Sequence, residues 1–244
     1  MEEISTVMSG HLLLAGGSEF GGQMAAPDRH SIQLAGGLDA PIAIIPTAAA
    51  PDNNHRRAGE NGRRWFTSLG ATNVQVVPLV DRNSASEETV VEQIREAKLV
   101  YLLGGFPGYL CETLRDTPAW TAMLAARAAG AVLAGSSAGA MVLCQYLNDP
   151  RGHGVTNGLG LVPNACVLPH HNTFGQGWAD RLRDLLPNAT LIGIDEETAM
   201  ISDASARTWR VHGAGDVTLY QPGQPLSHPQ RYLAGQELHL QAPE

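Results

Sequence analysis

The stretch from Ala131 to Leu143 constrains this chain most, because it joins two apolar runs through a turn of small residues. It reads AVLAGSSAGAMVL and predicts a buried strand, a very tight turn and a buried helix. The turn fits Gly-x-Ser-x-Gly with Ser137 at its centre, where flanking glycines are needed because the serine backbone is strained and larger neighbours would clash. Ser137 is therefore a candidate nucleophile, and the N–H of Ala138 is placed to receive an oxyanion. Ser136 is interpreted as a structural hydroxyl, because centring the pattern on it puts alanines where glycines are needed.

Composition limits the classes of partner and the compartment. The net charge is −8 with no long basic run, which argues against nucleic acid and anionic membranes as partners. The first residues lack the basic start of a secretory signal and no apolar run reaches spanning length, so we expect a cytoplasmic protein. One domain covering residues 1–244 is expected, with two smaller ones left open. Three cysteines in apolar surroundings predict core residues rather than disulfides or a metal knuckle: Cys111, Cys144 and Cys166.

Apolar strand patterns alternate with helical ones along most of the chain. Besides the strand that begins at Ala131, strands are predicted at His11–Leu14, Pro41–Ile45, Val74–Val77, Leu99–Leu103, Ala165–Leu168 and Leu191–Ile194. Helices are predicted at Arg56–Leu69, after a capping box of Ser84 and Glu87, at Thr117–Ala129, at Ala138–Leu147 and at Trp178–Leu186. This alternation predicts an α/β fold with right-handed βαβ units and a mainly parallel sheet covered by helices on both faces.

The pattern changes in the last quarter of the chain. Short strands separated by turn residues predict antiparallel hairpins at one edge of the sheet: Thr198–Ser202, Thr208–His212 and Val217–Tyr220. The glycine-rich segment Asp149–Leu161 is predicted to be a loop, and the tail from Gln221 onward is predicted to be irregular.

Four groups of reactive or glycine residues each follow a predicted strand. They are Gly104-Gly105, Ser137, His170-His171 and Asp195-Glu196-Glu197. In open α/β sheets ligands bind beyond the carboxyl ends of the strands, so parallel strands would bring all four groups to one edge of one sheet. A nucleophile, a base, a carboxylate and a turn with free N–H groups are the components of a serine hydrolase.

Within these groups the roles are assigned as follows. His170 is preferred as the base, with His171 as the alternative, and Glu196 is preferred as the orienting acid, with Asp195 or Glu197 left open. The amide of Gly105 serves as an oxyanion donor if its strand neighbours the nucleophile strand.

Other ligands are less well supported by the sequence. Adjacent histidines in an extended segment point apart, so we predict no metal site at His170-His171. The Gly16–Gly22 segment departs from Gly-x-Gly-x-x-Gly, and we predict no cofactor. Phe106 and His171 are candidate substrate contacts at the mouth of the site, and Arg181 is a candidate for holding a substrate carboxylate, with helix-surface charge as its alternative.

Taken together, these segments resemble the peptidase E (aspartyl dipeptidase) and cyanophycinase family of serine peptidases. The resemblance rests on the AGSSAGA elbow, the strand followed by Gly-Gly, the PH segment, the GIDEETAM segment and the order Ser, His, Glu. It implies a class I glutamine amidotransferase-like (flavodoxin-like) fold, a three-layer sandwich with a mainly parallel central sheet. It also implies cofactor-free hydrolysis of a small peptide or isopeptide next to an aspartyl residue. Ser137, His170 and Glu196 match the family triad, and Gly105 and Ala138 match its oxyanion donors.

The resemblance leaves some alternatives open. The family commonly has Asn or Asp after the double glycine, whereas this chain has Phe106-Pro107, so the aspartyl preference is not fixed. An esterase of the α/β-hydrolase type would instead use Ser137 with a later histidine, His212 or His228. A non-catalytic binding protein on the same fold is a further alternative, and a homodimer is one assembly that the sequence allows.

Overall fold

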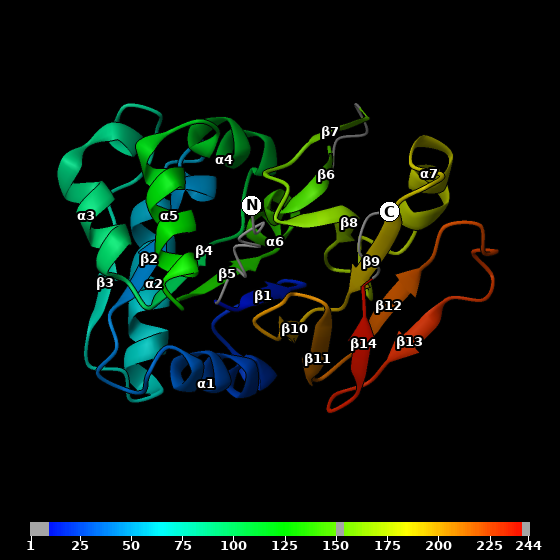
Figure 1. Cartoon of the computed structure of the whole chain (residues 1–244), viewed down its shortest axis with the longest axis horizontal. Coiled ribbons are helices and arrows are strands. Elements are labelled where there is room, and N and C mark those ends of the chain that lie inside the picture. Colours follow the sequence, from blue (N-terminus) through cyan, green and yellow to red (C-terminus); the bar gives the residue numbers. More distant parts are fainter. Residues whose placement is uncertain (1–9, 150–153, 241–244) are drawn as a thin grey trace, which may run out of the picture.

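The strands of the chain form two separate sheets, as seen in a computed structural model that describes residues 10–149 and 154–240 (Figure 1). The eight-stranded sheet has the order β14 (Glu237–His239), β11 (Thr208–Gly213), β10 (Thr198–Ser202), β1 (Leu12–Ala15), β5 (Val132–Ser136), β4 (Leu99–Leu102), β2 (Ile42–Ile45) and β3 (Val74–Val76). The six-stranded sheet has the order β13 (Gln230–Tyr232), β12 (Val217–Tyr220), β9 (Thr190–Ile194), β8 (Val162–Leu168), β6 (Cys144–Asn148) and β7 (Val155–Asn157). The fold is therefore mixed α/β.

Each sheet has a parallel part and an antiparallel part. Strands β1, β5, β4, β2 and β3 run parallel, and β10, β11 and β14 continue the same sheet antiparallel. In the other sheet β6, β8 and β9 are parallel, while β7, β12 and β13 are antiparallel. The parallel strands end at the same side of their own sheet, which is where the candidate site residues follow them.

Helices cover the strands on several faces. They are α1 (Ala25–Leu34), α2 (His55–Ser68), α3 (Glu88–Glu96), α4 (Pro107–Leu114), α5 (Pro118–Ala128), α6 (Ala138–Leu143) and α7 (Trp178–Leu185). Three short 3-10 turns precede α1, α2 and α3: η1 (Gly22–Met24), η2 (Thr47–Ala49) and η3 (Ser84–Ser86). Helix α5 begins with a capping Thr117, whose Oγ1 accepts from the amide of Trp120, followed by Pro118, as the sequence predicted.

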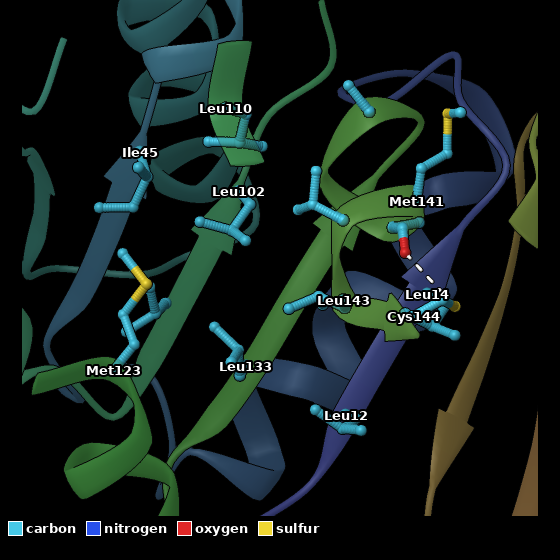
Figure 2. Packing of buried hydrophobic residues seen from close by; sticks show 14 of the residues in the cluster. Leu12, Leu14, Ile45, Leu102, Leu110, Met123, Leu133, Met141, Leu143 and Cys144 are labelled. Atoms are coloured by element: carbon cyan, nitrogen blue, oxygen red, sulfur yellow. Dashed lines mark hydrogen bonds between the residues drawn. The ribbon is translucent and has the colours of Figure 1, made fainter. Parts of the chain in front are cut away.

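The eight-stranded sheet is apolar on both faces, because alternate residues of a strand point to opposite sides. Leu12 and Leu14 of β1 belong to one buried cluster, together with side chains from α3, α4, α5 and α6. Leu13 and Ala15 belong to another, with side chains from α1 and α2. Figure 2 shows part of the first cluster, in which Leu12, Leu133 and Leu102 lie on the neighbouring strands β1, β5 and β4. Helices therefore cover both faces of this sheet.

One apolar cluster also takes side chains from both sheets. Val167 of β8 and Ile192 of β9 are buried in the cluster that contains Leu12 and Leu14. On the other face of the six-stranded sheet, Cys166 and Leu168 pack with the apolar face of α7. The sheets thus share a packed interior, which fixes the position of strand ends in one sheet relative to those in the other.

Several local predictions differ from the structure. The predicted helix Ala138–Leu147 ends at Leu143, and Cys144 begins strand β6. The predicted loop Asp149–Leu161 contains β7, with residues 150–153 outside the described ranges, and the predicted irregular tail contains β13 and β14. Ser84 lies in η3, where its Oγ accepts from the amides of Val80 and Asp81, so the predicted capping box is wrong.

The prediction that the four candidate groups follow strands of one sheet is also wrong. Strands β4 and β5 belong to the eight-stranded sheet, whereas β8 and β9 belong to the six-stranded sheet. The late strands are likewise divided, because β10 and β11 extend the first sheet and β12 pairs with β9 in the second. Both sheets bury apolar runs of the same kind, so the sequence pattern alone does not tell which sheet a strand joins.

Candidate active site

Ser137 lies at the tip of a strained elbow between β5 and α6, defined here as Gly135–Gly139. Its backbone has φ 49° and ψ −110°, a conformation that residues other than glycine rarely adopt. A Cβ on Gly135 would lie 2.4 Å from the carbonyl carbon of Gly139, and a Cβ on Gly139 would lie 2.3 Å from the carbonyl oxygen of Leu102. The amide of Ser137 donates to the carbonyl of Ala15 at 3.0 Å. The two glycines are therefore required by close packing, as the sequence pattern predicted.

The hydroxyl of Ser137 meets the imidazole of His170. Ser137 Oγ lies 3.0 Å from His170 Nε2, and His170 Nδ1 lies 2.7 Å from Glu196 Oε1. With the proton on Nδ1, the imidazole donates to the carboxylate and leaves Nε2 free to accept from the serine. Residues that are 33 and 26 positions apart in the chain thus form one hydrogen-bonded series.

A double glycine at the end of β1 makes room for the imidazole. The amide of His170 donates to the carbonyl of Gly16 at 2.7 Å. Gly17 has φ +122°, and a Cβ at this position would lie 2.2 Å from Cε1 of His170. Sequence reasoning assigned no functional role to these glycines, because their contact with His170 depends on the docking of two sheets.

Glu196 is held as an anion by its surroundings. The hydrogen bond from His170 is the main reason that the pKa of Glu196 lies below its ordinary value, and hydrogen bonds from Thr173 and Ser18 act in the same direction. Thr173 Oγ1 donates to Glu196 Oε1 at 3.2 Å, and the amide of Glu196 donates to Asn172 Oδ1 at 2.9 Å. The turn after His170 therefore orients the carboxylate, a role that sequence reasoning missed.

The alternative acids and the alternative base are occupied elsewhere. Asp195 Oδ2 accepts from the amide of Asp216 at 2.9 Å, and Glu197 Oε2 accepts from the amide of Gln23 at 3.0 Å. His171 Nε2 is hydrogen bonded to the hydroxyl of Tyr220 at 2.9 Å, and burial lowers the pKa of its imidazole. Of the two candidate histidines and the three candidate acids, His170 and Glu196 are therefore the ones hydrogen bonded in series with Ser137.

The histidines of the esterase alternative contact residues other than Ser137. His212 stacks on His30 with ring centroids 5.1 Å apart, and His228 Nδ1 is hydrogen bonded to Ser227 at 2.9 Å. The geometry therefore gives no support to a triad in the order serine, acid, histidine.

The glycine turn, defined here as Gly104–Gly105, lies beside the elbow because β4 and β5 are paired, with Leu102 opposite Gly135. Gly105 has φ +138°, and a Cβ there would lie 2.2 Å from the carbonyl oxygen of Ala48. That carbonyl instead accepts from the amide of Phe106 at 2.8 Å. In the described ranges, no turn or loop hydrogen bond uses the amide of Gly105, which leaves it available to an oxyanion.

Two clefts meet at the glycine turn. The turn cleft, of about 340 Å³, is lined by Gly105 and Phe106 together with Glu19, Asn54, Arg57 and Asn61, among others. A larger cleft of about 650 Å³ is lined by Gly105, Phe106, Tyr109 and Glu112, among others. Phe106 lines both clefts, and its contact with a substrate stays a prediction. His171 and Arg181 line neither of these clefts, and Arg181 donates to Asn148 Oδ1 at 2.9 Å.

The imidazole of His170 is covered by an aromatic side chain. The ring of Phe174 stacks on it with centroids 4.4 Å apart, and Phe174 is itself 64% exposed.

Within the described residues, no group of three or more His, Cys, Asp or Glu side chains could hold a metal ion, and no helix is long and apolar enough to span a membrane.

The chain is similar to known peptidases over most of its length. Residues 12–208 match the model of peptidase family S51. A cyanophycinase from Nostoc sp. is 32% identical over 209 residues, covering 80% of this chain and 67% of that protein. A cyanophycinase from Thermosynechococcus vestitus is 30% identical over 210 residues, covering 78% of this chain and 61% of that protein.

Solved structures give the same relationship. The crystal structure of a peptidase from an acI-B1 Actinobacterium is 33% identical, with a TM-score of 0.84, and covers 96% of this chain and 98% of that one. A putative peptidase E protein from Listeria monocytogenes, 20% identical with a TM-score of 0.58 and coverage of 87% and 98%, shows a likeness in fold. The chain therefore belongs to peptidase family S51 and is a serine-type peptidase.

Proposed function

We propose that this peptidase cleaves a small peptide or isopeptide next to an aspartyl residue, through an acyl-enzyme formed on Ser137. The observation that supports the triad is the hydrogen-bonded series from Ser137 Oγ through His170 to Glu196, at 3.0 and 2.7 Å. A hydroxyl, an imidazole and a carboxylate in this order are the groups that activate a serine.

In the first half of the reaction, His170 Nε2 takes the proton of Ser137 as the serine oxygen attacks the scissile carbonyl carbon. The carbonyl oxygen becomes an oxyanion, and the amides of Gly105 and Ala138 donate to it. Glu196 stabilises the imidazolium through Nδ1. His170 then gives its proton to the leaving amine, and the acyl group stays on the serine.

In the second half, water replaces the amine beside His170. Nε2 removes a proton from the water as its oxygen attacks the acyl carbon, and the same two amides hold the second oxyanion. The tetrahedral intermediate collapses, the proton returns to Ser137 Oγ, and the product leaves as a carboxylic acid. No step in this sequence needs a cofactor.

The aspartyl preference is supported by the turn cleft. Arg57, Asn54 and Asn61 line it on the side of α2, and they supply hydrogen-bond donors for a carboxylate beside Gly105. The aspartyl substrate that the family resemblance implies is the same choice. The cleft of about 340 Å³ lies at the lower end of the size range of small-molecule sites, which suits a small peptide.

The finer description of the fold is also a proposal. We infer one domain over residues 1–244 with the three-layer arrangement of class I glutamine amidotransferase-like proteins. Its support is that helices cover both faces of the eight-stranded sheet.

The test uses purified protein with α-aspartyl, β-aspartyl and unrelated dipeptides, and with simple esters for the esterase alternative. We expect Ser137→Ala and His170→Gln to lower kcat by at least about 10³-fold, because each removes a member of the acyl-transfer machinery. We expect Glu196→Gln to lower it by at least about 10²-fold, because a neutral amide stabilises an imidazolium less well than a carboxylate. Labelling by a fluorophosphonate should require Ser137.

The matched control is Glu197→Gln, which changes the next residue in the same way and keeps an oxygen to accept from Gln23. It should retain most of the activity. A wild-type protein that hydrolyses none of the dipeptides and takes up no fluorophosphonate contradicts the proposed function, as does full activity in Ser137→Ala.

A further inference from the structure

We infer that Glu19 is a positioning residue that holds the glycine turn against the nucleophile elbow. Glu19 Oε1 accepts from the amide of Gly104 at 3.2 Å, and Glu19 Oε2 accepts from the hydroxyl of Ser136 at 2.8 Å. These two partners each directly precede a proposed catalytic group, the amide of Gly105 and the hydroxyl of Ser137. One carboxylate therefore connects the oxyanion donor to the nucleophile, and the inference rests on the proposed function.

The two segments are in contact at this point. A Cβ built on Gly104 would lie 3.1 Å from Glu19 Oε1 and 3.4 Å from the Cβ of Ser137. The side chain of Ser136 is completely buried, so its hydroxyl has no access to water and depends on a protein partner. The bond from Ser136, at 2.8 Å, is the shorter of the two, and hydrogen bonds to a carboxylate are stronger than those between neutral groups, which suits a side chain that fixes a distance between two segments.

The backbone around Glu19 is folded to deliver this side chain. The flanking residues Ser18 and Phe20 have φ values of 54° and 68°, in the left-handed region that residues other than glycine rarely occupy. The ring of Phe20 packs against Phe66 and Tyr101, with centroids 6.2 and 5.7 Å apart. Local strain that is maintained by surrounding packing is common at functional sites.

The consequence for catalysis is geometric. Strands β4 and β5 are paired up to Leu102 and Gly135, but beyond them the two segments leave the ladder. Backbone hydrogen bonds there hold Ser137 to Ala15 and Phe106 to Ala48, and the carboxylate of Glu19 connects the two segments to each other. A misplacement of about 1 Å in such a site lowers rates by about 10²-fold. The hydrogen bonds of Glu19 go to Gly104 and Ser136, so we expect their loss to fall on kcat rather than on KM. Glu19 also lines the turn cleft, and any effect of its charge on KM is shared by the alanine and glutamine variants.

The experiment compares Glu19→Ala with Glu19→Gln. The alanine variant loses both bonds, and we expect kcat to fall by about 10²-fold with KM changed by less than about threefold. Glutamine can accept from Gly104 through Oε1 and donate to Ser136 through Nε2, so it keeps the connection without the charge. We expect Glu19→Gln to restore kcat to within about tenfold of the wild type, and Glu60→Gln, which removes a charge elsewhere on the surface, to leave it unchanged.

The possible failures are distinguishable. If the wild type shows no Ser137-dependent hydrolysis, the proposed function is overturned. If it does, and folded Glu19→Ala has wild-type kcat, or if Glu19→Gln is as slow as Glu19→Ala, the positioning role is overturned while the proposed function stands. If Glu19→Ala does not fold, Ser136→Ala tests the positioning role, because it removes one of the two hydrogen bonds of Glu19. A lower kcat at unchanged KM supports the role, and an unchanged kcat refutes it.

Discussion

The residues proposed to carry the chemistry have unusual backbone conformations. Ser137 and His170 have φ values of 49° and 51°, and Gly105 has φ +138°. Non-glycine residues in this region cost of the order of 1–3 kcal/mol each and persist when the surrounding structure imposes them. Here the surrounding structure includes the bonds from the amide of Ser137 to Ala15 and from the amide of His170 to Gly16. The conformations hold the hydroxyl and the imidazole where they meet.

At this scale the sequence identified Ser137, His170 and Glu196 through their positions after strands, but not their supports. Asn172, Thr173 and Glu19 are ordinary polar residues in turns, and nothing in their local pattern separates them from solvated ones. Their contacts with the triad and the glycine turn come from the path of the backbone. Of the two adjacent histidines, His170 is hydrogen bonded to Ser137, whereas His171 is hydrogen bonded to Tyr220.

Arg57 provides the residue-scale prediction. It is exposed in the turn cleft, and within the described residues it has no side-chain hydrogen bond or ion pair, so it is available to a substrate carboxylate. We expect Arg57→Ala to raise KM for aspartyl dipeptides by about tenfold and to leave neutral dipeptides almost unaffected, as expected for the loss of one charge-assisted contact. The measurement is steady-state kinetics on both substrates.

The control for Arg57 is its neighbour. Arg56 is also exposed on α2 but does not line the turn cleft, so Arg56→Ala should leave KM for both substrates unchanged. Equal changes in the two variants would attribute the effect to net charge and remove the carboxylate role.

Among the elements, β5 and α6 pack closely at the elbow. Gly135→Ala would place a methyl group 2.4 Å from the backbone of Gly139. Because backbone atoms cannot move aside cheaply, we expect a loss of at least about 1–3 kcal/mol in the free energy of unfolding, measured by chemical denaturation. Gly108→Ala in α4 is the control: nothing lies within 4 Å of its Cβ, so its stability should change by less than about 1 kcal/mol. A Gly135→Ala protein as stable as that control contradicts the packing interpretation.

The prediction of elements failed where one apolar pattern fits two structures. Residues 144–147 continue the apolar run of α6, yet they form the beginning of β6 because the chain pairs there with β8. Short apolar runs cannot be separated into helix and strand by periodicity alone. The same limit applies to β13 and β14, whose pairing with β12 and β11 depends on contacts distant in sequence. Strands with buried, uninterrupted runs such as β1 and β4 were predicted well.

For the whole molecule, two buried groups give opposite dependences of stability on pH. Burial raises the pKa of Asp28 from its ordinary 3.8 to about 7, although the hydrogen bond from Trp65 acts against this. Between these values the folded state holds a proton that the unfolded state has released, so stability falls as pH rises. Burial lowers the pKa of His212 from 6.5 to about 4, with His30 and Arg210 acting in the same direction. There the unfolded state holds the extra proton, so stability increases as pH rises from about 4 to 6.5.

Thermal melts of single variants should separate the two contributions. Asp28→Asn keeps an oxygen to accept from Trp65, and we expect its Tm to exceed that of the wild type at pH 8, where Asp28 is charged in the wild type. In Asp28→Asn, Tm should rise with pH between about 4 and 6.5, and in His212→Gln it should fall with pH between about 4 and 7. Parallel Tm curves for the wild type and both variants would contradict the assignment.

Ser137 follows a strand of the eight-stranded sheet, His170 follows one of the six-stranded sheet, and Glu196 lies in the turn from β9 to β10 that passes between the sheets. The distance between Ser137 Oγ and His170 Nε2 thus depends on how the two β-sheets pack against each other. A substitution in the interior that the two sheets share, far from any substrate, can therefore change the distance between the hydroxyl of Ser137 and the imidazole of His170. Smaller side chains at Val167 or Ile192 should then change kcat, although neither residue contacts the hydroxyl or the imidazole.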